Sequence, residues 1–303
     1  MHQQQEAEWL ASRFEEHRTH LRSVAYRMLG SLIEADDAVQ EAWLRLSRSD
    51  ASEIDNLGGW LTTVVARVCL NMLRSRNLRR EEPLENGNAD VYVPDPIISR
   101  DSSLDPENAA VMADSVGLAL LVVLETLAPA ERLAFVLHDM FGVSFDEIAG
   151  ILGRSSTSTR QLASRARRRI RHSAPVPDAD LTAQRQVVDA FFAAAHNGDF
   201  EGLVAVLDPD IVLRSDGGTR RHNLTAVLRG AETVASQASG FSQWAPFVRP
   251  AVVNGAAGAV VRRPGQPPFS VMAFTVRGGK IVEIDALVDP DRLSKLDLKL
   301  LDA

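Results

Sequence analysis

Cysteine is nearly absent from this sequence of 303 residues, in which Cys69 is the only one. A single thiol cannot form an intramolecular disulfide. It also cannot supply the several thiolate ligands that a zinc finger or a similar structural metal site needs. A chain without disulfides is typical of a reducing compartment, so we expect a cytoplasmic protein that carries neither a metal nor another cofactor.

Long apolar runs are also missing, since none approaches the roughly 20 residues that a membrane-spanning helix needs. The N-terminal stretch MHQQQEAEWLASRFEEH is polar and acidic and does not resemble a secretory signal. With 45% hydrophobic and 24% charged residues, the composition is that of a soluble globular protein with hydrophobic cores. We therefore expect no membrane partner, and a chain of this length holds about two or three domains.

Two breaks divide the chain into three structured blocks. Apolar residues three or four positions apart predict helices over about residues 6–80 and again over 109–171. Between them lies a linker with several prolines, although its stretch VYVPDPII is too apolar for an inert spacer. The expected boundaries are residues 1–80 and 109–172 for two helical domains, 81–108 and 173–180 for linkers, and 181–303 for a third domain.

The last block has a different character. VVDAFFAAAHNGDFEGLVAVL has a helical pattern, whereas PAVVNGAAGAVVRR, FSVMAFTVR and GKIVEIDALV are rich in β-branched residues and bounded by glycine and proline. FTVRGGKIVEI predicts a hairpin that turns at Gly278 and Gly279. The sequence therefore predicts a multidomain protein in which two all-α domains precede an α+β domain.

Positive charge gathers in one short stretch, although the whole chain has a formal net charge of -7. In the segment FDEIAGILGRSSTSTRQLASRARRRIR (residues 145–171), Phe145, Ile148 and Leu152 have the spacing of an amphipathic helix. The second half of the segment contains no acidic residue. Its arginines are Arg154, Arg160, Arg165, Arg167, Arg168, Arg169 and Arg171.

A turn and a second helix follow the first. Gly153 can adopt the left-handed conformation that ends a helix, and Ser155 or Ser156 can cap the next one. With Leu162 and Ala166 facing inward, this is the layout of a helix-turn-helix, whose second helix enters the major groove of DNA. We expect DNA contacts from residues suited to base edges and phosphates, namely Ser158, Thr159, Arg160, Gln161, Ser164, Arg165 and Arg167. The alternative is a helical hairpin with a solvated charged face, which the lack of compensating acids in the cluster disfavours.

The setting of this motif resembles the extracytoplasmic-function (ECF) sigma factors of bacterial RNA polymerase. FDEIAGILGRSSTSTRQLASRARRR, preceded by LETLAPAERLAFVLHDMFGVS, is similar to domain four of that family. LRSVAYRMLGSLIEADDAVQEAWLRL and GGWLTTVVARVCLNMLRSR are similar to its domain two. The resemblance covers roughly the first 172 residues and implies an initiation factor that binds core RNA polymerase and promoter DNA.

The resemblance also implies roles for individual residues. The segment that docks on core polymerase in this family corresponds to Asp36, Asp37, Gln40, Glu41 and Trp43. The segment that opens the minus-ten element and holds its exposed strand corresponds to Asn56, Trp60, Arg67, Asn71 and Arg74, with Arg76, Arg79 and Arg80 extending its basic end. The acids Asp36 and Asp37 are also interpreted as first-turn acids of their helix, and Trp43 and Trp60 can equally belong to the core.

The third domain resembles the SnoaL-like branch of the cone-shaped α+β fold, which is found in a subgroup of ECF sigma factors as a regulatory extension. QVVDAFFAAAHNGDFEGLVAVLDPDIVLRSDGG and IVEIDALVDPDRL carry this resemblance. VYVPDPI in the linker is similar to an aromatic-proline motif of the same subgroup, but without its tryptophan. The two regulatory motifs of the subgroup correspond here to Asp216, Gly217 and Gly218, and to Asp289, Pro290, Asp291 and Arg292. We therefore expect the third domain to modulate the sigma domains from within the same chain.

Two other roles for the third domain stay open from sequence. As an enzyme it would use Asp216, His222 or Asp285 as acid or base, but no convincing catalytic set emerges. As a sensor it would bind an unknown small ligand in an apolar pocket lined by Trp244, Phe247, Phe269 and Phe274. The rival to a sigma factor is a free-standing helix-turn-helix regulator, which would have no use for a promoter-melting segment.

Overall fold

The computed structural model describes residues 2–49, 54–80, 91–99 and 117–298, which form two compact units. The first unit contains residues 1–84, 106–114 and 123–173, and the second contains 85–105, 115–122 and 174–303. Helix α5 (Leu118–Glu125) spans the division between them. The predicted helical residues 109–116 lie outside the described residues.

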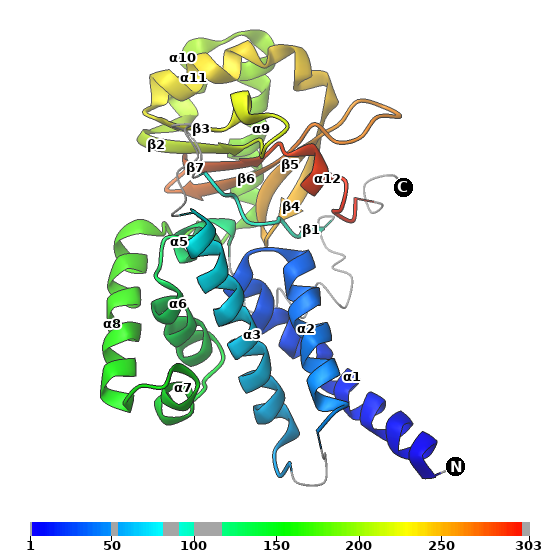
Figure 1. The fold of residues 1–303 in the computed structure, drawn as a ribbon. Coiled ribbons are helices and arrows are strands. Elements are labelled where there is room, and N and C mark those ends of the chain that lie inside the picture. The colour runs from blue at the N-terminus through cyan, green and yellow to red at the C-terminus, as the bar shows by residue number, and fades with distance from the viewer. Residues whose placement is uncertain (1, 50–53, 81–90, 100–116, 299–303) are drawn as a thin grey trace. The chain divides into compact units, whose positions relative to one another are not determined.

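The first unit begins with α1 (His2–Leu29), α2 (Leu32–Leu46) and α3 (Leu57–Arg80), which pack on one another (Figure 1). The buried face of α2 is formed by Ala35, Ala38, Val39, Ala42 and Leu46. The interpretation of Asp36 and Asp37 as first-turn acids is wrong, because the helix already begins at Leu32. The acid in its first turn is Glu34.

The second half of this unit contains α6 (Pro129–Phe135), a π-helical turn (Val136–Met140), α7 (Phe145–Leu152) and α8 (Ser156–Ser173). The side chain of Arg132 on α6 is buried and joins this half to α1. The Arg132 guanidinium is 2.7 Å from Glu125 and donates two hydrogen bonds, of 3.3 and 3.2 Å, to the carbonyl of Arg27 on α1. A buried cation is tolerated here because a carboxylate and a carbonyl both compensate its charge.

The second unit is built on a sheet of seven strands among the described residues, in the order β1-β4-β5-β6-β7-β2-β3. Its neighbours are antiparallel except for β2 and β7, which run parallel. The strands are β1 (Ile98–Ser99), β2 (Leu207–Asp216), β3 (Ala226–Arg229), β4 (Val248–Val253), β5 (Ala256–Val261), β6 (Ser270–Arg277) and β7 (Lys280–Leu287). The α+β prediction for this part of the chain is confirmed.

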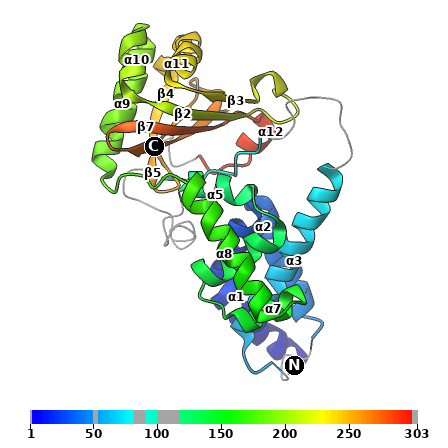
Figure 2. The same ribbon diagram turned by 90° about the vertical axis from the view of Figure 1, so that its left-hand side faces the viewer.

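Helices cover one face of this sheet (Figures 1 and 2). They are α9 (Leu181–Asn197), α10 (Phe200–Val206) and α11 (Ala231–Gly240), and their apolar side chains share a core with β2, β5, β6 and β7. Phe191 on α9 and Phe274 on β6 lie in this core with their ring centroids 5.6 Å apart. The predicted hairpin joins β6 and β7, and both Gly278 and Gly279 have the positive φ angles that its two-residue turn requires.

The linker before the second helical domain contributes the edge strand β1, which pairs with β4 in the antiparallel sense. Residues 93–99 are buried within the second unit. The expectation that VYVPDPII is more than a spacer is therefore confirmed. Of the described helices, none is long and apolar enough to cross a membrane.

Candidate functional site

Local hydrogen bonds set the geometry of the helix-turn-helix. Ser144 and Glu147 form a reciprocal capping box at the start of α7, and Gly153 ends that helix with φ 64°. The Ser155 hydroxyl then accepts a 3.2 Å hydrogen bond from the backbone N–H of Ser158 and so caps α8. The predicted stop and cap are confirmed, with Ser155 rather than Ser156 as the capping residue.

The inward face of α8 corrects one predicted DNA contact. Thr159, Leu162, Ala163 and Ala166 form its buried stripe, and Thr159 is fully buried. Its hydroxyl donates to the backbone carbonyl of Ser155. The prediction that Thr159 is available to DNA is therefore wrong, because it lies three and four positions before Leu162 and Ala163 on the same face.

Of the other predicted residues of α8, Arg160, Gln161, Ser164 and Arg165 are exposed, while Ser158 and Arg167 are half-buried. The expectation that this cluster lacks compensating acids is wrong. Arg165 is 2.7 Å from Glu131 on α6, and Arg167 is 2.6 Å from Asp139 on the π-helical turn. These acids are distant in sequence and are brought to α8 only by the fold.

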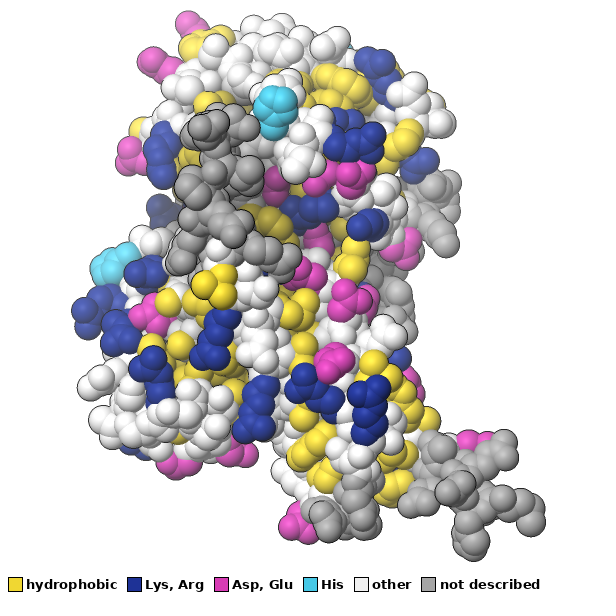
Figure 3. Space-filling view, viewed as in Figure 1, with side chains coloured by type: hydrophobic (Ala, Val, Ile, Leu, Met, Phe, Trp, Pro, Cys, Tyr) yellow, Lys and Arg dark blue, Asp and Glu magenta, His cyan; other side chains and the backbone are white. Residues whose placement is uncertain are grey.

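Arg160 differs from these two arginines. Its guanidinium lies 5.5 Å from the ring centroid of Phe145 and has no acidic partner among the described residues. Arg168 and Arg171, which the sequence placed in the basic cluster, continue the same exposed helix face, and so does Thr157, which sequence reasoning left out. The spacing of three positions between Thr157 and Arg160 was the available signal. Figure 3 shows Lys and Arg side chains gathered over α8.

Helix α3 exposes a second polar row. Arg67, Asn71 and Arg74 are exposed at positions i, i+4 and i+7, so they share one face of the helix. Trp60 is half-buried, so neither of its two interpretations is excluded. Asn56 precedes the helix and caps it, since its side chain accepts a 3.0 Å hydrogen bond from the N–H of Gly59.

The basic end of α3 is only partly exposed. The Arg76 guanidinium forms an ion pair with Glu34 on α2 and donates a 3.1 Å hydrogen bond to the carbonyl of Leu29. This arginine is therefore committed to packing α3 against its neighbours. The side chains of Arg79 and Arg80 lie outside the described residues.

Helix α2 carries the residues that the resemblance assigned to polymerase binding. Asp37 and Gln40 are exposed, whereas Asp36 pairs with Arg22 at 2.7 Å. Glu41 pairs with Arg45 at 2.8 Å. Trp43 is half-buried, with its ring centroid 5.2 Å from that of Phe14, so it serves the core as well as the surface.

In the second unit, Asp216 and Arg292 hold the linker. The carboxylate of Asp216 accepts a 3.0 Å hydrogen bond from the N–H of Val93 and lies 2.8 Å from the Arg292 guanidinium. Arg292 also donates to the carbonyl of Val93 and to the carboxylate of Asp95, and its guanidinium lies 4.5 Å from the ring centroid of Tyr92. Burial by itself lowers the pKa of Arg292. The interactions with Tyr92, Asp95 and Asp216 outweigh this effect, so the pKa of Arg292 is raised.

The two predicted C-terminal motifs build this linker site together. A side chain at Gly217 would collide with the carbonyl of Arg221, and one at Gly218 with the carboxylate of Asp289. Asp289 caps the short helix α12 (Pro290–Leu293), which carries Arg292. Asp216 is 4% exposed, and its carboxylate binds the linker as well as the N–H of Gly218.

A further pair of hydrogen bonds fixes the far end of the linker segment. The N–H of Ile97 donates to the side chain of Asn254, and the N–H of Asn254 donates to the carbonyl of Ile97, both over 2.9 Å. Sequence reasoning missed Asn254, although the pair Asn254-Gly255 signals a tight turn. Asp95 was missed as well, because nothing in its surroundings in sequence indicates a partner 197 positions away.

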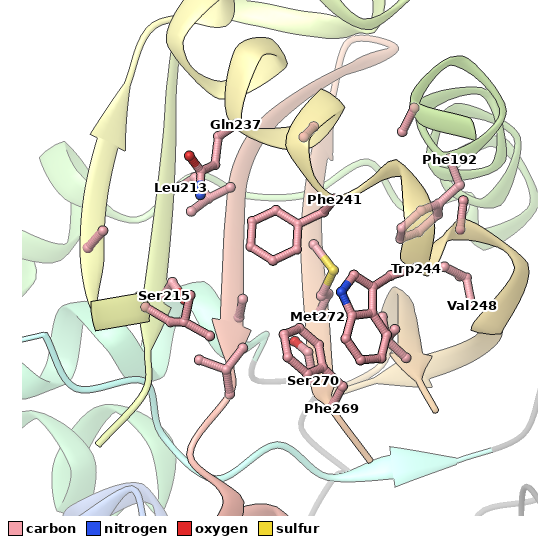
Figure 4. A pocket seen from close by; sticks show the side chains of 18 of the residues that line it. Phe192, Leu213, Ser215, Gln237, Phe241, Trp244, Val248, Phe269, Ser270 and Met272 are labelled. Carbon is pink, nitrogen blue, oxygen red and sulfur yellow. The ribbon is translucent and has the colours of Figure 1, made fainter. Parts of the chain in front are cut away.

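A cavity of about 150 Å³ opens between the helices and the sheet of this unit (Figure 4). Trp244 and Phe269 line it as predicted. Phe274 does not, because it is buried in the core, and Phe247 packs beside Trp244 outside the lining. The candidate acid-base residues Asp216, His222 and Asp285 do not line the cavity, so these candidates for an active site there are not supported.

Asp285 belongs to a buried charge cluster elsewhere in the unit. It lies 3.1 Å from Arg214, which also pairs with Glu283 at 3.0 Å. Burial raises the pKa of Asp285 to about 6, because the loss of hydration outweighs the attraction of Arg214 and Glu283 adds repulsion. Among the described residues, no group of histidine, cysteine and acidic side chains is arranged to hold a metal ion.

Comparisons with known proteins agree with the two helical parts of the first unit. Residues 13–79 match the family described as Sigma-70 region 2, and residues 117–170 match Sigma-70, region 4. The first match contains α2 and all but the last residue of α3, and the second contains the helix-turn-helix.

Whole-length relatives extend the similarity to the second unit. The chain is 37% identical to ECF RNA polymerase sigma factor SigJ of Mycobacterium tuberculosis, over 95% of this chain and 94% of that one. It is 36% identical to the probable ECF RNA polymerase sigma factor SigI of the same organism, over 94% of each. The crystal structure of SigJ has a TM-score of 0.76 with this chain, at 34% identity, and covers 95% of this chain and 99% of that one.

Proposed function

Because the chain belongs to the extracytoplasmic-function sigma factors of RNA polymerase, we propose that three helices of its first unit divide the work of such a factor. Helix α2 binds core RNA polymerase, α3 engages the minus-ten element, and α8 recognises the upstream element. A sigma factor directs core polymerase to promoters and helps to open them, while the polymerase makes the RNA. The location that follows from this partner is the cytoplasm.

The observation that carries the proposal is the exposed face of α8. Arg160, Gln161 and Ser164 lie on the side opposite the buried stripe, directly after a capped turn. Arginine and glutamine form bidentate hydrogen bonds with guanine and adenine edges in the major groove. Arg168 and Arg171 continue this face toward the end of the helix and suit contact with phosphates.

The minus-ten role rests on the exposed row of α3. Arg67 and Arg74 are charged and accessible, with Asn71 between them. An opened promoter strand needs cations along its backbone and polar or aromatic groups for its unpaired bases. Trp60 is the aromatic candidate at the other end of this helix.

The polymerase role rests on the accessible polar side of α2. Asp37 and Gln40 are exposed on it, and Asp36 and Glu41 present their carboxylates there while pairing with arginines of this chain. The carboxylates of both pairs are exposed to solvent, and the Glu41–Arg45 pair is exposed on both sides, so exchanging that pair for one with a polymerase surface costs little.

The second unit acts, in this proposal, by holding the linker between the two sigma domains. Residues 93–99 are buried in that unit, and Asp216, Arg292 and Asn254 bind their backbone. A linker whose backbone is bound in this way is not available to other partners until it is released. The unit therefore modulates the sigma domains by binding or releasing the linker, and it needs no catalytic residues to do so.

The experiment that tests this function is run-off transcription by core polymerase with the purified chain. The full chain should direct transcription from specific promoters, and a protein that ends at His172 should give a different transcript yield because the linker has lost its partner. Identical yields from a truncated protein that retains its helical circular dichroism would contradict the modulatory role. A free-standing regulator would bind duplex DNA without supporting transcription by core polymerase.

A further inference from the structure

Two arginines of α8 lie at the margins of its exposed face. The middle of this face is formed by Arg160, Ser164, Arg168 and Arg171. Arg165 follows Ser164 by one position, and Arg167 precedes Arg168 by one. Because one residue turns an α-helix by about 100°, the two arginines leave the middle row in opposite directions and lie on its two sides.

An acid from another element holds each of these arginines. Glu131 on α6 accepts a 2.7 Å hydrogen bond from Nε of Arg165, and Asp139 on the π-helical turn accepts one of 2.6 Å from Nε of Arg167. The side chain of Glu131 is 13% exposed against 56% for Arg165, and that of Asp139 is 23% exposed against 33% for Arg167. Each arginine is therefore held from the protein side while part of it remains exposed.

Both contacts leave the ends of the guanidiniums unoccupied. Each acid binds Nε, and the terminal nitrogens of Arg165 and Arg167 form no hydrogen bond with any of the described residues. A guanidinium carries five N–H donors in a planar fork, and two of them can bind one phosphate at the same time. Fixing Nε therefore orients the guanidinium without using its terminal donors.

The two acids do not make the margins of the face negative. Glu131 also lies 3.9 Å from Arg169, whose guanidinium donates a 3.0 Å hydrogen bond to the carbonyl of Thr126. One carboxylate thus faces two arginines on this side of α8. On the other side, Arg171 is exposed one turn after Arg167. Positive charge exceeds negative charge at both margins, so both attract phosphates.

A helix that enters the major groove lies between two phosphate backbones. We propose that Glu131 and Asp139 are positioning residues, which orient the terminal nitrogens of Arg165 and Arg167 toward phosphates on the two sides of the groove. The middle of the face reads base edges, and its margins bind the backbones. This inference rests on the proposed role of α8 and adds two acids that touch no DNA themselves.

The sign of one substitution separates positioning from simple charge repulsion. If the acids only oppose DNA through their charge, replacing either by alanine should tighten binding. If they position the arginines, the same change should weaken binding, because an unrestrained arginine loses more rotamer entropy when it binds a phosphate. Glu131→Gln and Asp139→Asn keep an oxygen that accepts from Nε, so these variants should retain binding.

Fluorescence anisotropy measures the binding of polymerase reconstituted with the full chain to a labelled duplex that carries only the upstream element. At about 150 mM salt, where charges are screened beyond about 8 Å, we expect Glu131→Ala and Asp139→Ala each to weaken binding by about three- to tenfold. Glu131→Gln and Asp139→Asn should bind within about twofold of the parent protein. Glu15→Ala, which removes one negative charge from an exposed pair on α1, is the matched control and should leave the affinity unchanged.

The arginines themselves test the phosphate contacts. Arg165→Ala and Arg167→Ala should each reduce the dependence of log K on log salt by about 0.9, the value of one phosphate of duplex DNA. Both should weaken binding to a duplex of scrambled sequence by the same factor, because a phosphate contact carries no sequence information. Arg160→Ala should instead act mainly on the duplex that carries the upstream element.

The inference is overturned if Glu131→Ala and Asp139→Ala tighten binding or behave like Glu15→Ala. It is also overturned if Arg165→Ala and Arg167→Ala leave the salt dependence unchanged. If Arg160→Ala weakens binding in either case, α8 still reads DNA and only the positioning role fails. If the parent complex does not distinguish the upstream element from the scrambled duplex, the proposed function of α8 fails together with this inference.

The test does not depend on the alanine variants of the two acids remaining folded. Arg165 is exposed and Glu131→Gln is a conservative change, so both Arg165→Ala and Glu131→Gln should keep the thermal unfolding midpoint of the parent protein. The salt dependence of Arg165→Ala decides the outcome even if Glu131→Ala unfolds.

Discussion

The guanidinium of Arg292 lies 2.8 Å from the carboxylate of Asp216, although the two residues are 76 positions apart in sequence. Both also bind the backbone of Val93. Asp216 accepts a hydrogen bond from the N–H of Val93, and Arg292 donates one to the carbonyl of Val93. One ion pair therefore joins the two C-terminal motifs to each other and to the linker between the sigma domains.

Arg292→Ala should release the linker. The change removes the charge partner of Asp216 and Asp95, which are both buried. Breaking a buried pair from one side leaves uncompensated charge, so the free energy of unfolding of the second unit should fall on the order of 3 kcal/mol. Chemical denaturation measures this loss, and limited proteolysis should show faster cleavage near residues 91–99.

The matched control for Arg292 is Arg220→Ala. Arg220 pairs with Asp291 at 2.8 Å, but both side chains are more than half exposed. Such exposed pairs contribute little, so this variant should unfold and be cleaved like the parent protein. Equal effects of the two substitutions would contradict a specific role for Arg292 at the linker.

Arg160→Ala should weaken recognition of the upstream promoter element. The side chain is exposed on α8 and has no acidic partner among the described residues, so it is available to a base edge. Loss of one such contact costs roughly 1–3 kcal/mol and relaxes the preference at one base position. Competition binding with promoter variants, with the chain bound to core polymerase, measures both effects.

The neighbouring residue Thr159 provides the control for Arg160→Ala. Thr159→Val keeps the shape of the buried side chain but removes the hydroxyl that donates to Ser155. It should lower stability by about 1 kcal/mol and leave base preference unchanged. A changed base preference in Thr159→Val, or an unchanged one in Arg160→Ala, would refute the assignment of the α8 face.

Arg67→Ala and Arg74→Ala should each weaken binding to the opened minus-ten strand. If each arginine neutralises one phosphate, the dependence of log K on log salt should lose about 0.7 per substitution with single-stranded DNA. Titration of a non-template-strand oligonucleotide with the reconstituted polymerase complex gives this slope. Arg18→Ala, on the exposed surface of α1, should leave the slope unchanged.

The raised pKa of Asp285 should make the free energy of unfolding depend on pH. Burial raises its pKa to about 6 in the folded chain, above the roughly 3.9 of an unfolded aspartate. Between these two pKa values the folded state binds more protons than the unfolded state does. The ionised Asp285 therefore lowers the free energy of unfolding above pH 6, and this loss is recovered as the pH falls toward 4. Between pH 7 and pH 5 the parent protein should gain about 1 kcal/mol in unfolding free energy relative to Asp285→Asn. Identical pH profiles would contradict the raised pKa.

Local patterns account for what the sequence predicted well. The cap at Ser155, the stop at Gly153 and the hairpin turn at Gly278 depend on neighbours within a few positions, and all three are present. The order of two helical domains and an α+β domain follows equally from periodicity, which reflects which face of each element is buried.

Long-range partners account for what it missed. Glu131 and Asp139 neutralise arginines of α8 from elements 34 and 28 positions away, and no pattern within α8 indicates them. Thr159 was assigned to DNA because it is polar, but it lies on the buried stripe of α8 and is not exposed to DNA. Asp95 likewise acquires its role only because the linker folds onto α12.

Binding of the full chain to core RNA polymerase, with no DNA present, tests the central claim most directly. Size-exclusion chromatography and fluorescence anisotropy of a labelled chain should show a stoichiometric complex, and Asp37→Arg should weaken it by reversing an exposed charge on α2. Release of the linker by Arg292→Ala should leave complex formation possible. The absence of any complex with both the parent chain and Arg292→Ala would contradict the assignment as a working sigma factor.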